Sequence, residues 1–159
     1  MYVDTKRMIA EQLFEILEHK KLEDVTIKYL VDSCHISRQT FYYHFQDIID
    51  VLEWGTKMAI EQDLATSLQA QDSRDAIRIF AFRVIRNKEI TRSLLESKRR
   101  DEFEHILVNG FHTYLQELFR RRWPNPKLPI GDIDAFLDFY TYGLIGLILK
   151  HCKSRNIDG

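Results

Sequence analysis

Apolar residues recur along this chain at the spacing of amphipathic helices, and no stretch alternates as a half-buried strand would. Ile27, Leu30, Val31 and Cys34, for example, stand at i, i+3, i+4 and i+7, which places them on one helix face. The pattern predicts helices over about 3–19, 27–34, 37–45, 48–68, 74–86, 90–95, 99–123 and 132–154. We therefore expect an all-α fold, with a three-helix N-terminal head and a C-terminal helical bundle.

Residues 26–45 predict two short helices joined by a tight turn. Thr26 and Ser37 each precede a short apolar pattern and can act as N-caps, because a hydroxyl accepts a hydrogen bond from the first turn. His35 and Ile36 make the break between the two helices. This is the layout of a helix–turn–helix.

The second of these helices divides its residues between two faces. Phe41 and Phe45 are four apart and can both face inward. The outer face carries Arg38, Gln39, Thr40, Tyr43 and His44. A helix that enters a DNA major groove needs this division, with one face to hold it and the other to reach bases and phosphates.

Composition agrees with a helical protein of 159 residues. It has 45% hydrophobic and 30% charged residues, with six glycines and three prolines, too few for a turn-rich β fold. Cys34 and Cys152 lie far apart in helical contexts and do not suggest a disulfide framework. The longest apolar run, 139–149, is too short to span a bilayer, and no signal peptide is recognisable. We expect a soluble cytoplasmic protein.

Net charge gives no basic footprint of the kind that many DNA-binding domains carry. The whole chain stands at −1, and residues 1–50 hold six Lys and Arg against nine Asp and Glu. Glu11, Glu15 and Glu18 form one stripe of the first helix, however, and could point away from DNA. The charge is therefore compatible with DNA binding but predicts modest non-specific affinity.

Two units are expected. Residues 1–50 form the DNA-binding head, a fourth helix connects to about residue 68, and residues 69–159 form a regulatory and dimerisation body. The last helix is apolar on nearly every side, so something must bury it. We expect a homodimer formed through a four-helix bundle of the last two helices. The predicted interface residues are Phe111, Leu118, Tyr140, Gly143, Leu144 and Leu147.

The aromatic residues of the body admit two interpretations. They can be core and dimer interface, or they can line an enclosed pocket for a small-molecule effector. For the second interpretation the pocket residues would be Phe80, Phe103, Phe111, Tyr114, Phe139 and Tyr140.

Metal and catalytic motifs are not recognisable in the sequence. His105 and His112 could share a helix face, and His151 and Cys152 are adjacent, but no compact set of metal ligands results. No phosphate loop, nucleophile–base motif or paired carboxylates in a known context occur. We expect no cofactor, no metal and no enzyme activity.

The stretch TIKYLVDSCHISRQTFYYHFQD resembles the helix–turn–helix signature of the TetR family of bacterial transcriptional regulators. The run RQTFYYHFQD, followed by Leu52-Glu53-Trp54, looks most like the branch related to the dihydroxyacetone kinase operon regulator. The segment FYTYGLIGLI (139–148) resembles the last helix of that branch. The resemblance implies an all-helical homodimer that binds a palindromic operator, with repression as the expected effect.

The resemblance also implies roles for individual residues. Arg38, Gln39, Thr40 and Tyr43 would face bases, while Thr26, Ser37, Tyr42 and His44 would contact phosphates or position the head. Arg can bond guanine bidentately and Gln adenine, which agrees with the first group.

Three positions depart from the family pattern. His35 stands where glycine is usual in the turn, and a left-handed backbone there costs a non-glycine residue about 1–2 kcal/mol. Gln39 replaces a frequent glycine, and Ile48 replaces the usual lysine that contacts phosphate. The missing lysine and the acidic head leave an alternative open, a helical adaptor or co-regulator controlled mainly by a protein partner and binding DNA weakly.

Overall fold

The computed structural model of this chain describes residues 4–69, 78–79, 82–83, 85–124, 127 and 129–153. These residues form helices and connecting loops, and no strand occurs among them, so the predicted all-α fold is confirmed. Of the predicted helix over 74–86, only 78–79, 82–83 and 85–86 are among the described residues, and the predicted pocket residue Phe80 lies outside them.

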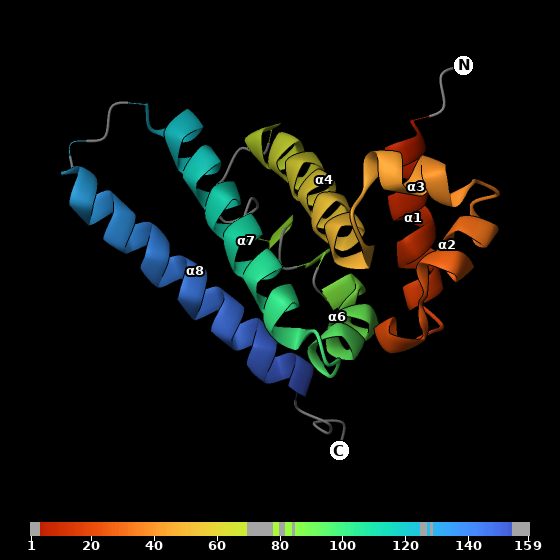
Figure 1. The fold of residues 1–159 in the computed structure, drawn as a ribbon. Coiled ribbons are helices and arrows are strands. Elements are labelled where there is room, and N and C mark those ends of the chain that lie inside the picture. Colours follow the sequence, from red (N-terminus) through yellow and green to blue (C-terminus); the bar gives the residue numbers. More distant parts are fainter. Residues whose placement is uncertain are drawn as a thin grey trace.

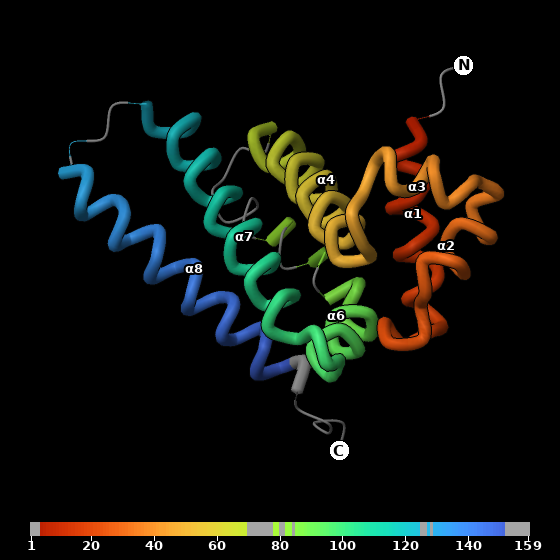
Figure 2. The backbone as a smooth tube through the Cα atoms, in the orientation of Figure 1, coloured from red at the N-terminus to blue at the C-terminus, as the bar shows by residue number. Residues whose placement is uncertain are grey.

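The elements follow the predicted order (Figures 1 and 2). They are α1 (Thr5–Leu17), the 3-10 turn η1 (Leu22–Asp24), α2 (Ile27–Ser33), α3 (Arg38–His44), α4 (Ile48–Gln69), α6 (Lys88–Leu95), α7 (Arg100–Arg122) and α8 (Ile130–Lys153). We call α1 to α3 the head and α6 to α8 the body, with α4 connecting them.

The head packs on α4. Leu13, Leu30, Phe41 and Leu52 are fully buried there, one from each of the four helices. At Gly55 the two long helices α1 and α4 come very close, since a Cβ at this position would stand 2.6 Å from a ring carbon of Phe14. A side chain at Gly55 would therefore displace the Phe14 ring or push α1 away from α4.

In the body, α7 packs against both α4 and α8 (Figure 1). The buried Tyr114 stacks on Phe111, and its hydroxyl lies 2.7 Å from the hydroxyl of Ser67 on α4. Arg122 donates a hydrogen bond of 2.7 Å to the Ser67 carbonyl. Burial raises the pKa of Tyr114 above its ordinary value, so the phenol stays neutral and serves as a structural link between α4 and α7.

Two polar contacts tie the head and the start of α4 to the turn between α6 and α7. A carboxylate oxygen of Glu23 in η1 accepts a hydrogen bond of 2.8 Å from the backbone N–H of Lys98. Arg99 reaches Asp47, the residue before α4, with an Nη2–Oδ2 distance of 3.5 Å, and the same guanidinium is held by Glu102 at 2.6 Å. The turn between α6 and α7 thus contacts both η1 and the residue before α4.

The last helix is buried within the chain on one side. Leu137, Thr141 and Ile145 are buried against the body, but the opposite side of α8 is open. Phe139 is 74% exposed and Tyr142 64% exposed. No described helix is both long and apolar enough to cross a membrane.

Candidate nucleic-acid interface

The turn between α2 and α3 has a Schellman geometry. The N–H of Ile36 bonds the carbonyl of Val31 at 3.1 Å, and the N–H of His35 bonds that of Asp32 at 3.2 Å. His35 has a φ of 53°, in the left-handed region where such motifs usually have glycine. The strain expected from the sequence at this position is therefore present.

Both predicted N-caps form. The Thr26 hydroxyl oxygen accepts a hydrogen bond from the N–H of Tyr29 at 3.1 Å, and Ser37 accepts one from the N–H of Thr40 at 3.0 Å. The two hydroxyls of Ser37 and Thr40 are also 2.9 Å apart. These bonds define where α2 and α3 begin, and they fix the start of α3 relative to the turn.

The inner face of α3 is an aromatic anchor. Phe41 and Phe45 are buried, as predicted, with their ring centroids 6.1 Å apart. Phe45 in turn meets the ring of Trp54 on α4 edge-on, at a centroid distance of 6.0 Å. This packing fixes the rotation of α3 about its own axis, and therefore which side chains face outward.

The outer face of α3 carries the predicted contact residues. Arg38, Gln39, Tyr42 and Tyr43 are exposed, with Tyr43 at 84%, and they stand at i, i+1, i+4 and i+5 on one side of the helix. Within the described residues, Arg38 makes no ion pair. Its guanidinium is therefore available to a ligand.

The other four predicted contacts are less open or already engaged. Thr40 and His44 are half-buried, and the His44 ring lies edge-on to Tyr43 at 4.9 Å. Thr26 and Ser37 are exposed, but their oxygens serve as caps. A capping hydroxyl accepts a hydrogen bond and can still donate one, so Thr26 keeps a donor for a phosphate oxygen, while Ser37 and Thr40 keep one donor between their two bonded hydroxyls.

One residue beside this face was missed from the sequence. The ammonium of Lys6 lies over the ring of Phe45 at 5.0 Å and over that of Trp54 at 5.5 Å. It brings positive charge to the end of α3. Lys6 could not be predicted, because a single lysine in the first turn of α1 adds nothing to the apolar periodicity. Ile48 itself is buried.

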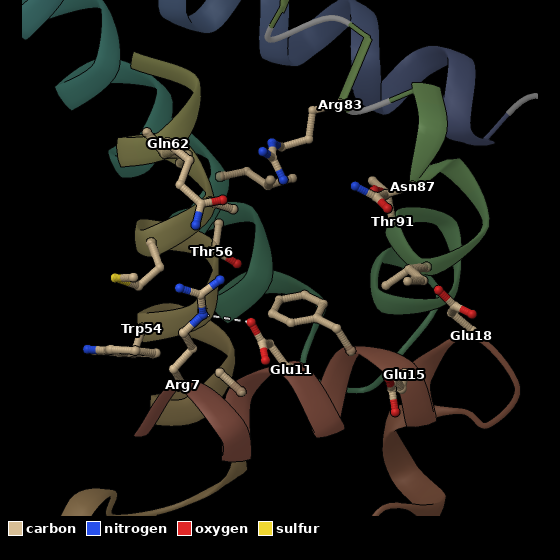
Figure 3. Close-up of a pocket in the computed structure, with 18 residues that line it drawn as sticks. Arg7, Glu11, Glu15, Glu18, Trp54, Thr56, Gln62, Arg83, Asn87 and Thr91 are labelled. Atoms are coloured by element: carbon tan, nitrogen blue, oxygen red, sulfur yellow. Dashed lines mark hydrogen bonds and ion pairs between the residues drawn. The ribbon is translucent and has the colours of Figure 1, made fainter. Parts of the chain in front are cut away.

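The start of α4 is acidic and capped. The Asp47 carboxylate accepts a hydrogen bond from the N–H of Asp50, and the Asp50 carboxylate accepts one from the N–H of Gln46, both at 2.9 Å. Negative charge at a helix N-terminus is favourable. The glutamate stripe of α1 (Glu11, Glu15 and Glu18) borders a cleft toward the body (Figure 3), so it is separated from α3.

The described members of the predicted effector pocket lie in different environments. Phe103, Phe111 and Tyr114 are buried in the core of the body, and Tyr114 also borders the groove between α4 and α7. Phe139 and Tyr140 lie on the exposed side of α8, with ring centroids 5.7 Å apart. The aromatic residues therefore divide between core and surface.

The predicted interface residues also divide. Phe111 and Leu118 are buried within the single chain, so they have almost no surface left for a partner, and Leu144 is half-buried. Tyr140 and Leu147 are exposed, and the Cβ position of Gly143 has nothing within 4 Å. His112 is engaged inside the chain, with its Nε2 3.3 Å from a carboxylate oxygen of Asp138.

A capped helix–turn–helix on an all-helical body is the architecture of a helix–turn–helix transcriptional regulator. Residues 75–155, more than half of the chain, match the TetR-type family model described as the C-terminal region of transcriptional regulators. The chain therefore belongs to the TetR family of transcriptional regulators.

Solved structures share the fold at low sequence identity. The dihydroxyacetone kinase operon activator DhaS matches with a TM-score of 0.64 and 15% identity, over 95% of this chain and 85% of that one. A TetR-family regulator from Syntrophomonas wolfei matches with a TM-score of 0.53 and 16% identity, over 98% of both chains. No curated protein matches the sequence.

Proposed function

We propose that this chain is a sequence-specific DNA-binding regulator that binds a palindromic operator as a homodimer, with α3 of each head in the major groove. The observation that carries the proposal is the outer face of α3, where Arg38, Gln39 and Tyr43 project from a helix that is fixed on its other side by buried Phe41 and Phe45. A recognition helix needs this combination of rigid seating and free polar side chains.

The exposed residues suit a division of work on DNA. Arg38 and Gln39 would bond base edges, because guanine presents two acceptors to an arginine and adenine a donor and an acceptor to a glutamine. Thr40 and Tyr43 would contact bases from the same face. Thr26, Ser37, Tyr42 and His44 would hold phosphates, a role in which Lys6 would assist.

The proposed dimer uses the open side of α8. Phe136, Phe139, Tyr140, Gly143 and Leu147 form a continuous stripe along this helix, and a Cβ at Gly143 or Gly146 would meet no atom within 4 Å. Glycines let a second helix approach closely, and the aromatic rings beside them supply the apolar area. Two copies packed through this stripe would form a four-helix bundle with α7.

Binding at an operator that overlaps a promoter would repress transcription by excluding the polymerase. The structural neighbour DhaS is named an activator, and an operator upstream of a promoter would allow the same dimer to activate. The position of the operator relative to the promoter therefore decides the sign, and a reporter assay in the cytoplasm of a bacterial host measures it. An effector would bind the body, with different affinity in two states of the dimer that differ in the arrangement of the heads.

Selection from a pool of random duplexes, with the purified full chain at physiological salt, tests the proposal. The expected result is enrichment of an inverted repeat whose half-sites are about one helical turn apart, or a multiple of that. Enrichment without symmetry would contradict the dimer. No enrichment at all would contradict DNA recognition and favour the adaptor, for which the acidic head and the open face of α8 would be the partner surfaces.

A further inference from the structure

A cleft of about 470 Å³ separates α1 from the body (Figure 3). One wall is α1 with the following Glu18, and the facing walls are α4, Arg83, and Asn87, Ile90 and Thr91 at the start of α6. The cleft is open to solvent and is distinct from the core of the body, where the aromatic residues of α7 are packed. Its size suits a small organic molecule.

The floor of the cleft is apolar. The floor consists of Ile60 from α4, Ile90 from α6 and Leu107 from α7. The ring of Phe14 on α1 lies against Gly55 on α4. Three of these side chains belong to the continuous core, so the floor cannot collapse without disturbing the packing of α4 on α7. A ligand with an apolar body would be favoured here over water alone.

A polar group at depth points to a hydrogen-bonding ligand. Thr91 lines the cleft and is only 7% exposed. Within the described residues its hydroxyl makes no hydrogen bond, while its backbone N–H donates one of 2.9 Å to the carbonyl of Asn87. Unlike the hydroxyl of Thr141, that of Thr91 is not fully enclosed, so a ligand atom or a water molecule in the cleft can reach it and bond with it.

Charge at the rim selects the sign of the ligand. Arg83 is neutralised by Asp63, to which it donates a hydrogen bond of 2.7 Å, and Arg7 is paired with Glu11 at the same distance. Glu15 and Glu18 remain, and neither forms an ion pair within the described part of the chain. After these pairs cancel, the described residues that line the cleft leave two negative charges and no free positive one.

We propose that the cleft between α1 and α6 binds a small organic cation, with its ammonium group at Glu15 and Glu18, its apolar body over Phe14 and Ile90, and a hydroxyl or similar group at Thr91. The exposed carboxylates and the deep hydroxyl place the two polar ends of the ligand at the rim and at the depth of the cleft. An anion of the same shape would face the two carboxylates and be repelled.

The regulatory consequence of this site rests on the proposed function. Because the head supplies α1 and the body supplies α6, a ligand that fits between them binds one arrangement of head and body better than another. Such differential affinity is the condition for an effector. Binding itself needs no DNA, and it can be measured alone.

Calorimetric titration of the full chain with three probes tests the site. Tyramine should bind, its analogue phenethylamine, which lacks the hydroxyl, should bind several-fold more weakly, and 4-hydroxyphenylpropionate should not bind. Thr91→Val should remove the advantage of tyramine over phenethylamine. Equal binding of the cation and the anion, or an unchanged preference in Thr91→Val, would overturn the proposal.

Two charge variants complete the test. The double variant Glu15→Gln/Glu18→Gln should lower the affinity for tyramine about tenfold, from two partly screened ion pairs. The control Glu53→Gln/Glu61→Gln removes the same amount of charge from α4 outside the cleft and should change the affinity for tyramine less than twofold. Equal effects of the two double variants would mean that only overall charge matters, which contradicts the site.

The operator measurement separates the two proposals. Tyramine binding without any operator selection would leave the cleft site standing and refute the DNA-binding role. Operator selection without tyramine binding would leave the DNA-binding role standing and refute the cleft site. If both hold, saturating tyramine should change operator affinity at least threefold, and an unchanged affinity would refute the coupling between them.

Discussion

Glu23 and Lys98 are 75 positions apart in sequence, yet a carboxylate oxygen of Glu23 accepts a hydrogen bond from the backbone N–H of Lys98 at 2.8 Å. The bond joins the 3-10 turn before α2 to the turn before α7. It also lowers the pKa of the Glu23 carboxyl below its ordinary value, because the N–H stabilises the charged form.

Glu23→Ala should therefore loosen the contact between head and body. For an exposed bond of this kind we expect a loss of about 1 kcal/mol in the free energy of unfolding. The folded-state pKa is lowered, so the contribution is present above the ordinary pKa of 4.5 and is lost as the pH falls through the folded-state value. Urea unfolding at pH 7 and pH 3 measures the difference between wild type and variant, which should shrink at pH 3. A constant difference would show that the charge of Glu23 is not involved.

Arg38→Ala should weaken binding to the selected operator by about 1–3 kcal/mol and relax the preference at one base pair of each half-site. Its fold should be unchanged, since the side chain is exposed and makes no ion pair among the described residues. Fluorescence anisotropy on matched and mismatched duplexes measures both effects.

Arg120→Ala is the control for this experiment, because it removes an exposed arginine at the far end of α7, paired with Glu117. Its effect on operator binding should be small and independent of sequence. An equal loss in both variants would assign the effect of Arg38 to general charge and contradict its role on bases.

His35→Gly should stabilise the head. The left-handed backbone at His35 strains a residue with a Cβ, and glycine removes this strain while adding some entropy to the unfolded chain. The expected gain is about 0.5–1 kcal/mol in the free energy of unfolding. His35→Val, with a β-branched side chain, should destabilise instead, and a loss of stability in the glycine variant would mean that the ring makes a compensating contact.

Gly55→Ala should destabilise the packing of α1 on α4. The added Cβ would stand 2.6 Å from the Phe14 ring and 3.3 Å from the Ala10 Cβ, so the ring must turn aside or the two helices must separate. Overpacking of this kind costs about 1–3 kcal/mol. Gly131→Ala is the matched control, because nothing lies within 4 Å of its Cβ position, and there alanine should gain helix propensity. Thermal unfolding of both variants decides whether the contact is as close as described.

Leu147→Glu should convert the proposed dimer to a monomer. Leu147 is 54% exposed on the open side of α8, so the charge is tolerated in one chain but would be buried without a partner between two. Sedimentation equilibrium measures the oligomeric state, and helicity by circular dichroism should be unchanged. Lys150→Glu introduces a carboxylate at an exposed position one turn away, near the end of the helix, and should disturb association less.

Much of the head was predictable because each of its features has a local sequence cause. Thr26 and Ser37 cap their helices, and the four-residue spacing of Phe41 and Phe45 decides which side of α3 is buried. These signals act within one or two helical turns, so the sequence carries them without reference to the rest of the chain.

The body was less predictable for physical reasons. Apolar periodicity predicts that a face is buried, but not whether the covering surface belongs to the same chain. Phe111 and Tyr140 were therefore assigned alike to pocket and interface, yet one lies in the core and the other on the surface. The cleft at Thr91 could not be predicted from the sequence, because its walls come from α1, α4, α6 and α7 and no spacing in the sequence connects them.

Helix α1 extends from the first turn, where Lys6 lies against Phe45 at the end of α3, to Glu15 and Glu18 at the rim of the cleft. With 13 residues it is a rod of about 20 Å. Pivoting such a rod by about 5° displaces its far end by roughly 1.7 Å, more than half the length of a hydrogen bond. A small tilt of α1 at the cleft would therefore shift the end of α3. In the proposed complex this shift would misalign α3 in the DNA major groove and weaken its contacts.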